Sequence, residues 1–201
     1  MTEVKDGSPS DIDSIADALV KAFHDDPVMM YMFRKEGGRD KKLRALFLSE
    51  SSRALTRGAL NTTTGGPAQG GAIWMAPDKW KTGGFELLGQ IPLLLKMGLA
   101  NTSRALSVLG QMEKIHPEEP HWYLAVLGTA PEYQGKGVGS ALVAPVLTKC
   151  DADLIPAYLE SSKESNIPFY ERHGFAVRGE IHVKNGPTLW PMWRDPQPPD
   201  A

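Results

Sequence analysis

The chain carries Gln134-Gly135-Lys136-Gly137-Val138-Gly139 between a strand-like run, Trp122–Leu127, and a helix-like run, Val138–Lys149. Glycine has no Cβ, so the backbone of such a stretch can come close to a ligand. The N–H groups in the first turn of a helix have no partner within it, and the helix dipole favours an anion in front of them. This order of strand, glycine-rich turn and helix predicts a phosphate-binding cradle, and the predicted ligand is a pyrophosphate.

The composition indicates one globular domain. The 201 residues are 41% hydrophobic, which is enough for one core and too little for two domains. The net charge of -2 leaves no basic excess to follow a nucleic acid backbone. The first ten residues lack the apolar run of a signal peptide, and the most apolar stretch, 91–100, contains Lys96 and is too short to span a bilayer. We therefore expect a cytoplasmic protein, monomeric or homodimeric, without nucleic acid or membrane partners.

Apolar spacing and turn residues predict an α/β fold. Helices are predicted from a cap at Ser10 to about residue 22, at 40–56, within 85–112 with a break near 98–102, at 137–150 and at 166–173. Strands are predicted at 59–63 and 71–75 as a hairpin, and then at 121–129, 157–160, 175–183 and 188–193. Pro145 predicts that the helix at 137–150 is either kinked or shorter. Residues 1–194 are predicted to form the domain, and 195–201, with three prolines, a flexible tail.

Two motifs carry a resemblance to a known family. The stretch Thr129–Gly139 resembles the acetyl-CoA motif of the GNAT superfamily of N-acetyltransferases, Gln/Arg-x-x-Gly-x-Gly/Ala. A second element of that family, an asparagine followed by a Phe-Tyr-Glu-x-x-Gly-Phe run, is matched by Asn166, Phe169, Tyr170, Glu171, Gly174 and Phe175. The resemblance implies the GNAT fold, with a mixed, mostly antiparallel central sheet of about six or seven strands flanked by helices.

A narrower resemblance is to the puromycin N-acetyltransferase type. It lies in Trp74, Pro77, Pro120, Trp122 and the ending from Gly186-Pro187 to Trp190. That subgroup acetylates the free amine of an aminonucleoside antibiotic. The resemblance thus implies a resistance-like enzyme that moves an acetyl group from acetyl-CoA to the primary amine of a small molecule.

The resemblance also implies where acetyl-CoA binds. The cradle amides would bind the pyrophosphate with added charge from Lys136, while the strand before them would run beside the pantetheine, with an amide near Leu127 polarising the thioester carbonyl. Asn166 would hydrogen-bond the pantetheine, although the same residue could simply cap a helix. The implied contacts are Leu127, Gly128, Thr129, Gln134, Gly135, Lys136, Gly137, Val138, Gly139, Ser140 and Asn166.

Direct attack of the amine on the thioester needs a proton donor for the leaving thiolate, and Tyr170 matches the family's general acid. An ordinary tyrosine pKa of about 10 against about 8.5 for a thiol makes that proton transfer uphill by about 2 kcal/mol. His121 lies thirteen residues before Gln134, where the histone-acetylating branch has a catalytic glutamate, and is the candidate base. Water could serve as the base instead for a weakly basic amine, and His121 would then only pack at a strand end.

Four residues are candidates for binding the acceptor amine: Phe23, Asp26, Tyr31 and Glu160. The carboxylates could attract a cationic amine or be solvated, and the aromatic residues near the end of the first helix could line the site or fill the core. The histidines have no spacing typical of a metal site, so no metal is predicted.

Two other functions fit parts of the pattern. A Rossmann-type dinucleotide-binding domain would explain the glycines and Glu160, but residues 130–134 separate the strand from the first glycine and the spacing is G-x-G-x-G. A regulatory module that binds CoA without turnover would use the same cradle and leave Tyr170 idle. Calorimetry with acetyl-CoA and NAD, and thiol release with a panel of amines, separate these possibilities.

Overall fold

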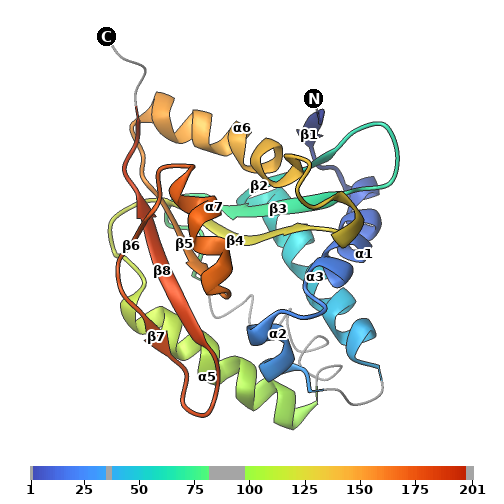
Figure 1. Ribbon diagram of the computed structural model, residues 1–201, viewed down its shortest axis with the longest axis vertical. Helices are drawn as coiled ribbons and strands as arrows, with labels where there is room; N and C mark the ends of the chain where they lie inside the picture. Colours follow the sequence, from blue (N-terminus) through green and yellow to red (C-terminus); the bar gives the residue numbers. More distant parts are fainter. Residues whose placement is uncertain (1, 35–37, 82–97, 198–201) are drawn as a thin grey trace.

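The computed structural model describes residues 2–34, 38–81 and 98–197. Its helices are α1 (Ile12–Ala22), α2 (Pro27–Met32), α3 (Arg39–Arg57), α5 (Leu99–Ile115), α6 (Val138–Asp153) and α7 (Ile167–Glu171), with 3-10 turns at η1 (Pro9–Asp11), η2 (Pro131–Tyr133) and η3 (Glu164–Asn166). Its strands are β1 (Val4–Asp6), β2 (Gly58–Thr63), β3 (Gly70–Met75), β4 (Trp122–Thr129), β5 (Ala157–Ser161), β6 (Ala176–Val177), β7 (Ile181–His182) and β8 (Thr188–Arg194). Figure 1 shows them in one α/β unit.

The strands form one mixed sheet. Its order is β1-β2-β3-β4-β5-β8-β6, and β7 also pairs with β8. Within the described chain, β4 and β5 are the parallel neighbours, and the other pairs are antiparallel. The prediction of a mixed, mostly antiparallel GNAT-type sheet is confirmed, with one or two strands more than expected.

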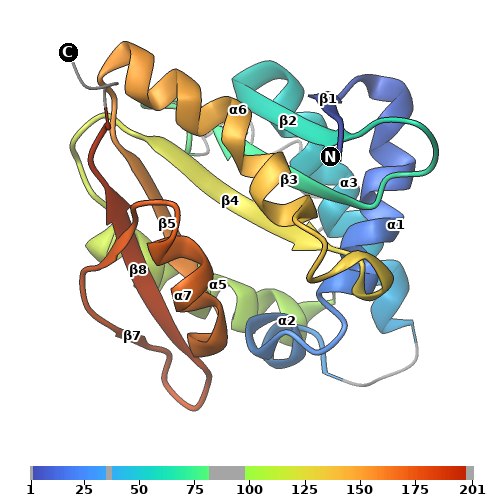
Figure 2. The same ribbon diagram turned by 45° about the horizontal axis from the view of Figure 1, so that its top comes forward.

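Helices cover both faces of the sheet because the central strands are apolar on both sides. Ile73 and Met75 of β3 pack into a core with α1 and α3, whereas Ala72 and Trp74 pack into a second core with α6. Alternate side chains of a strand point to opposite faces, so an entirely buried strand serves both cores. Figure 2 shows α6 crossing the sheet.

Parallel pairing between β4 and β5 stops early. The register pairs Trp122 with Ala157 and Tyr123 with Tyr158, although β4 continues to Thr129 and β5 to Ser161. A register shift against β3 between Ile73 and Trp74 marks a bulge in β4 at the same level, and bulges bend a strand away from its neighbour. The two strands therefore diverge, as Figure 2 shows, and leave backbone edges open between them.

The predicted start of the first helix needs correction, whereas its predicted end near residue 22 is confirmed. Ser8, not Ser10, precedes the helical region, where its side chain and backbone N–H both bond to the Asp11 carboxylate. The 3-10 turn η1 intervenes, and α1 starts at Ile12. The sequence prediction also missed α2, which begins at Pro27, a favourable first helical residue after the Asp26 cap.

The predicted strand at 175–183 is wrong. Two short strands, β6 and β7, replace it, because Gly179 adopts a φ of 145° that interrupts the extended chain. The helix around Pro145 is not shortened, since α6 runs through to Asp153. Pro145 lies on the exposed side of α6, where water can satisfy the backbone carbonyl that proline leaves without a partner.

Other predictions fall at the limits of the described chain. Most of the interrupted helical pattern at 85–112 lies outside it, and the described part begins α5 at Leu99, near the expected break. In the predicted tail, the indole of Trp193 donates to Asp195 and the Gln197 N–H donates to Asp151, while residues 198–201 lie outside the described chain. None of the described helices is both long and apolar enough to cross a membrane.

Candidate active site

A cavity of about 620 Å³ occupies the gap between the diverging strands. Its lining comes from α1, β4, the glycine-rich loop, β5 and α7. The sequence-predicted residues in it are Phe23, Asp26, Leu127, Gly128, Thr129, Gln134, Gly135, Gly137, Val138, Gly139, Ser140, Glu160, Asn166 and Tyr170. The fold thus brings the predicted cradle, the predicted acid and three of the four predicted acceptor residues to one space.

Backbone conformation forms the cradle. Gly135 and Gly137 have φ values of 71° and 81°, in the left-handed region that residues with a Cβ rarely adopt. The first α-helical bond of α6 joins the Ala141 N–H to the Gly137 carbonyl. The N–H groups of residues 138–140 therefore have no partner within the helix and are available to an anion.

Two polar side chains hold the loop in shape through hydrogen bonds to backbone carbonyls. The Gln134 amide donates to the Thr129 carbonyl at 3.0 Å and so ties the loop to the end of β4. Lys136 donates to the Glu132 carbonyl at 2.8 Å and lies over the Tyr133 ring. Lys136 does not line the cavity, so its predicted contact with the phosphates would require this ammonium group to leave Glu132.

Gly128 is required by packing. A Cβ there would lie 2.8 Å from Leu19 Cδ2, 2.8 Å from Phe23 Cε2 and 2.9 Å from Ala22 Cβ. Helix α1 thus presses directly on β4 beside the cavity. Packing against α1 therefore constrains the residue type at this position of β4.

Tyr170 lines the cavity from α7. Burial raises the pKa of its phenol above the ordinary value, and the nearby Asp26 charge raises it further. The phenol therefore stays protonated at neutral pH, and donation to a thiolate costs more than the 2 kcal/mol or so that ordinary pKa values give. Asn166 precedes α7 but makes no side-chain capping bond, so its amide is available to the cavity.

The two acidic residues in the cavity differ in their partners. Asp26 accepts the Met29 N–H at 2.9 Å as the cap of α2 and is also bonded by the Ser162 hydroxyl. Burial raises the pKa of Asp26 even with these bonds. Neither carboxylate oxygen of Glu160 makes a well-formed hydrogen bond in the described chain, although its side chain is only 1% exposed. The Tyr123 and Tyr158 hydroxyls are close to it, since burial and then the Glu160 carboxylate raise the pKa of both phenols.

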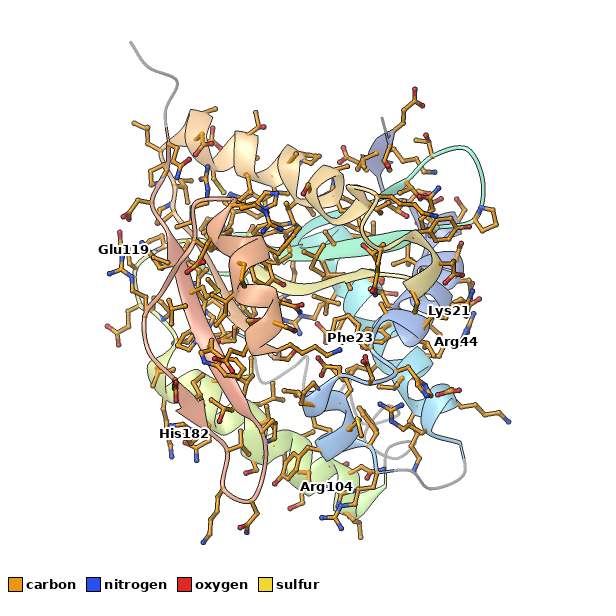
Figure 3. The ribbon with its side chains drawn as sticks, viewed as in Figure 1. Lys21, Phe23, Arg44, Arg104, Glu119 and His182 are labelled. Carbon is orange, nitrogen blue, oxygen red and sulfur yellow. The ribbon has the colours of Figure 1, made fainter. Side chains whose placement is uncertain are left out.

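The structure places His121 and Tyr31 away from the cavity. His121 precedes β4, where its Nδ1 donates to the Glu119 carbonyl at 2.6 Å; burial lowers its pKa. Figure 3 shows Glu119 on the opposite side of the molecule from Lys21, which pairs with Glu132 of the cradle loop. Tyr31 instead donates to the Lys184 carbonyl at 3.3 Å.

Sequence reasoning missed several residues near the site. Ser162, Lys163, Phe169 and Arg172 line the cavity, and His116 lies behind Glu160 with its Nδ1 3.6 Å from Oε1. The position of Phe169 inside the second motif could have identified it as a site residue. No sequence pattern identifies His116, because the turn between α5 and β4 brings it next to Glu160. Among the described residues, no group of three or more His, Cys, Asp or Glu side chains is arranged to bind a metal.

Comparison with known proteins agrees with this geometry. Residues 104–195 match the acetyltransferase (GNAT) domain family. An uncharacterized N-acetyltransferase of Schizosaccharomyces pombe is 28% identical over 93% of this chain and 81% of its own. A Corynebacterium glutamicum structure, described as histone acetyltransferase HPA2 and related acetyltransferase, is 27% identical with a TM-score of 0.74 over 100% of both chains.

A third similar protein was solved with coenzyme A bound. The PaiA N-acetyltransferase of Thermoplasma acidophilum, solved in complex with coenzyme A, has a TM-score of 0.58 at 12% identity over 97% of this chain and 99% of its own. Neither the Rossmann-type alternative nor the non-catalytic module finds support. Residues 104–195 therefore match a GNAT acetyltransferase domain, and the chain is an enzyme that uses acetyl-CoA.

Proposed function

We propose that the enzyme transfers the acetyl group of acetyl-CoA to the primary amine of a small molecule, by direct attack in a ternary complex. The observation that carries this proposal is the continuity of one cavity from the cradle amides to Tyr170 and Glu160. A buried carboxylate without well-formed hydrogen bonds is costly, and a cationic or neutral amine would satisfy it.

The chain's own residues fit acetyl-CoA. The free N–H groups of residues 138–140 suit the pyrophosphate, and the unpaired edge of β4 at 124–129 suits the amide-rich pantetheine. When bound, acetyl-CoA supplies an acetyl thioester as the electrophile. Asn166 and Ser140 are the side chains that we assign to positioning it.

Direct attack is favoured by the absence of a suitable nucleophile for an acetyl-enzyme. Cys150 is the only cysteine of the chain and is fully buried in the core between α6 and the sheet. Burial raises the pKa of its thiol to about 12, so it is neither reachable nor ionised. We assign the role of proton donor to the leaving thiolate to Tyr170.

The class of amine is open to a direct test. The residues of the puromycin-type resemblance include Trp74 and Trp122, which are buried in the core and therefore support the fold more than the acceptor. One similar structure is described as a histone acetyltransferase, so lysine peptides are the second candidate class of acceptor.

A thiol-release assay with acetyl-CoA should compare puromycin, aminoglycosides, polyamines, amino acids and lysine peptides. We expect release with small amines and initial-rate patterns that intersect. Release with lysine peptides alone would overturn the substrate class, and parallel rate patterns would overturn direct attack.

A further inference from the structure

Glu160 forms the inner wall of the cavity, and His116 stands directly behind it. The Glu160 side chain is 1% exposed and that of His116 is 2% exposed, with Nδ1 3.6 Å from Oε1. Neither Glu160 oxygen makes a well-formed hydrogen bond in the described chain, although the Tyr123 and Tyr158 hydroxyls are close enough for its charge to act on them. His116 is the basic side chain that contacts it. The chemistry of this contact depends on which atoms carry protons.

His121 fixes that arrangement. A carbonyl only accepts hydrogen bonds, so the 2.6 Å contact with the Glu119 carbonyl places a proton on His121 Nδ1. His121 stays neutral because burial lowers its pKa, and its Nε2 then carries a lone pair. The 3.0 Å contact between the two Nε2 atoms therefore requires His116 to be the donor.

The Nδ1 of His116 is left to face Glu160. Without a further proton, a nitrogen lone pair would oppose a carboxylate oxygen. One more proton removes this repulsion. It can lie on His116, which gives an imidazolium beside a carboxylate, or on Glu160, which gives a neutral imidazole beside a carboxylic acid. The geometry thus creates a place for one proton beside the cavity, and this proton belongs to the pair and not to either residue.

The surroundings favour a proton at this place. The Trp80 ring stacks on His116 with centroids 3.6 Å apart, which suits a cation. Tyr123 and Tyr158 meet His116 edge-on, and burial raises the pKa of both phenols, so they remain neutral. Two other charged groups act on this cluster. The Asp78 carboxylate acts on His121, and the Glu50 carboxylate acts on Tyr123. Glu50 is itself paired with Arg53 at 3.2 Å.

We propose that Glu160 and His116 form the proton-accepting pair for the acceptor amine, with Glu160 as the catalytic residue and His116 as the positioning residue behind it. The proposal rests on the proposed function. The amine nitrogen bonds to the acetyl carbon, and the carbon–sulfur bond breaks with its electron pair going to sulfur. The surplus N–H proton passes to Glu160 and is shared with His116, while the Tyr170 hydroxyl protonates the thiolate. Solvent then takes the pair's proton and restores that of Tyr170.

The first test needs neither acetyl-CoA nor a variant. Nitrogen-15 NMR of the histidine rings, recorded from pH 5 to 9 without ligands, reports which ring nitrogens carry protons. We expect His121 to keep a single proton on Nδ1, and the additional ring proton of the cluster to lie on His116 Nδ1. In Glu160→Gln, His116 should lose that proton, because the opposite charge is gone.

The second test is the pH profile of kcat/KM for the amine. The parent should show an acid limb, and Glu160→Gln should lose that limb and fall about 100-fold in rate. His116→Gln should keep part of the activity and shift the limb. The exposed pair of His182 and Glu180, 3.2 Å apart, offers the matched control, since His182→Gln should change neither profile nor rate. Thermal unfolding of each variant checks its fold.

The outcomes separate this pair from the proposed function. A second proton on His121 instead of His116, or a Glu160→Gln enzyme with the parent's rate and acid limb, would overturn the pair while amine acetylation stands. A parent that releases no thiol with any amine would overturn the proposed function, and with it the catalytic role of the pair.

Discussion

The two ends of the cavity bind by different means. At the cradle, the groups available to a ligand are backbone N–H groups, placed by two glycines with positive φ and by the start of α6. At the other end they are titratable side chains on different elements: Asp26 before α2, Glu160 on β5, Tyr170 on α7. Backbone donors do not titrate, so pH and side-chain substitutions should affect the second end far more than the first.

The largest expected effect lies at the side-chain end. Tyr170→Phe keeps the ring in place and removes the proton donor, so kcat should fall about 100-fold or more while the KM for acetyl-CoA changes by less than about twofold. Steady-state kinetics at saturating amine measure this. A variant with the parent's kcat would show that solvent protonates the thiolate and that Tyr170 is not the proton donor at the side-chain end of the cavity.

A smaller effect concerns the two aspartates, whose pKa values move in opposite directions. Arg194 lowers the pKa of Asp151 near the end of α6 through bonds at 2.7 and 2.8 Å. The stabilisation of the fold by this ion pair is fully present above the unfolded pKa of Asp151 and is lost as the pH falls through its folded pKa. Asp151→Asn should therefore cost about 2 kcal/mol at pH 7 and less as the pH falls below 3.8.

Asp26 at the cavity should show the opposite sign. Burial raises its pKa, so its contribution to stability is greatest below the unfolded value of 3.8 and is lost as the pH rises through the folded pKa. Asn is also a good cap, so Asp26→Asn should change stability at pH 7 by less than about 1 kcal/mol or increase it. Urea unfolding at pH 7 and below pH 3.8 measures the two variants, and equal pH dependence would contradict the assigned causes.

At the cradle, Gly137→Ala should cost about 1 to 2 kcal/mol because it places a Cβ on a left-handed residue. If that strain displaces the cradle, the affinity for CoA should fall about tenfold, with kcat little changed. Calorimetry with CoA measures it. Gly110→Ala is the control, since Gly110 lies in α5 without positive φ and its Cβ would meet open space.

The smallest effect is expected at Tyr31, which lies away from the cavity and bonds the Lys184 carbonyl. Tyr31→Phe should keep kcat/KM for the amine within about twofold, because a single exposed hydrogen bond contributes little. A loss of tenfold or more would restore Tyr31 as an acceptor-binding residue and extend the side-chain end of the cavity.

The sequence by itself determined the cradle, because its parts are contiguous: strand, glycines and helix follow one another, and their backbone conformation depends on local residue type. The hairpin of β2 and β3 and the second motif at Asn166–Phe175 were predictable for the same reason. Elements whose form depends on distant contacts were not, as α2 and the divided strand at 175–183 show.

Only the tertiary structure decided the other end of the cavity. Glu160 gains a buried environment and His116 as its neighbour through β5 pairing beside β4 and the turn that follows α5, and no local pattern encodes that meeting. The tertiary structure also places His121, the candidate base of the sequence analysis, in a buried position next to His116. Burial and the charges nearby set the ionisation of a side chain, and both depend on residues distant in the sequence.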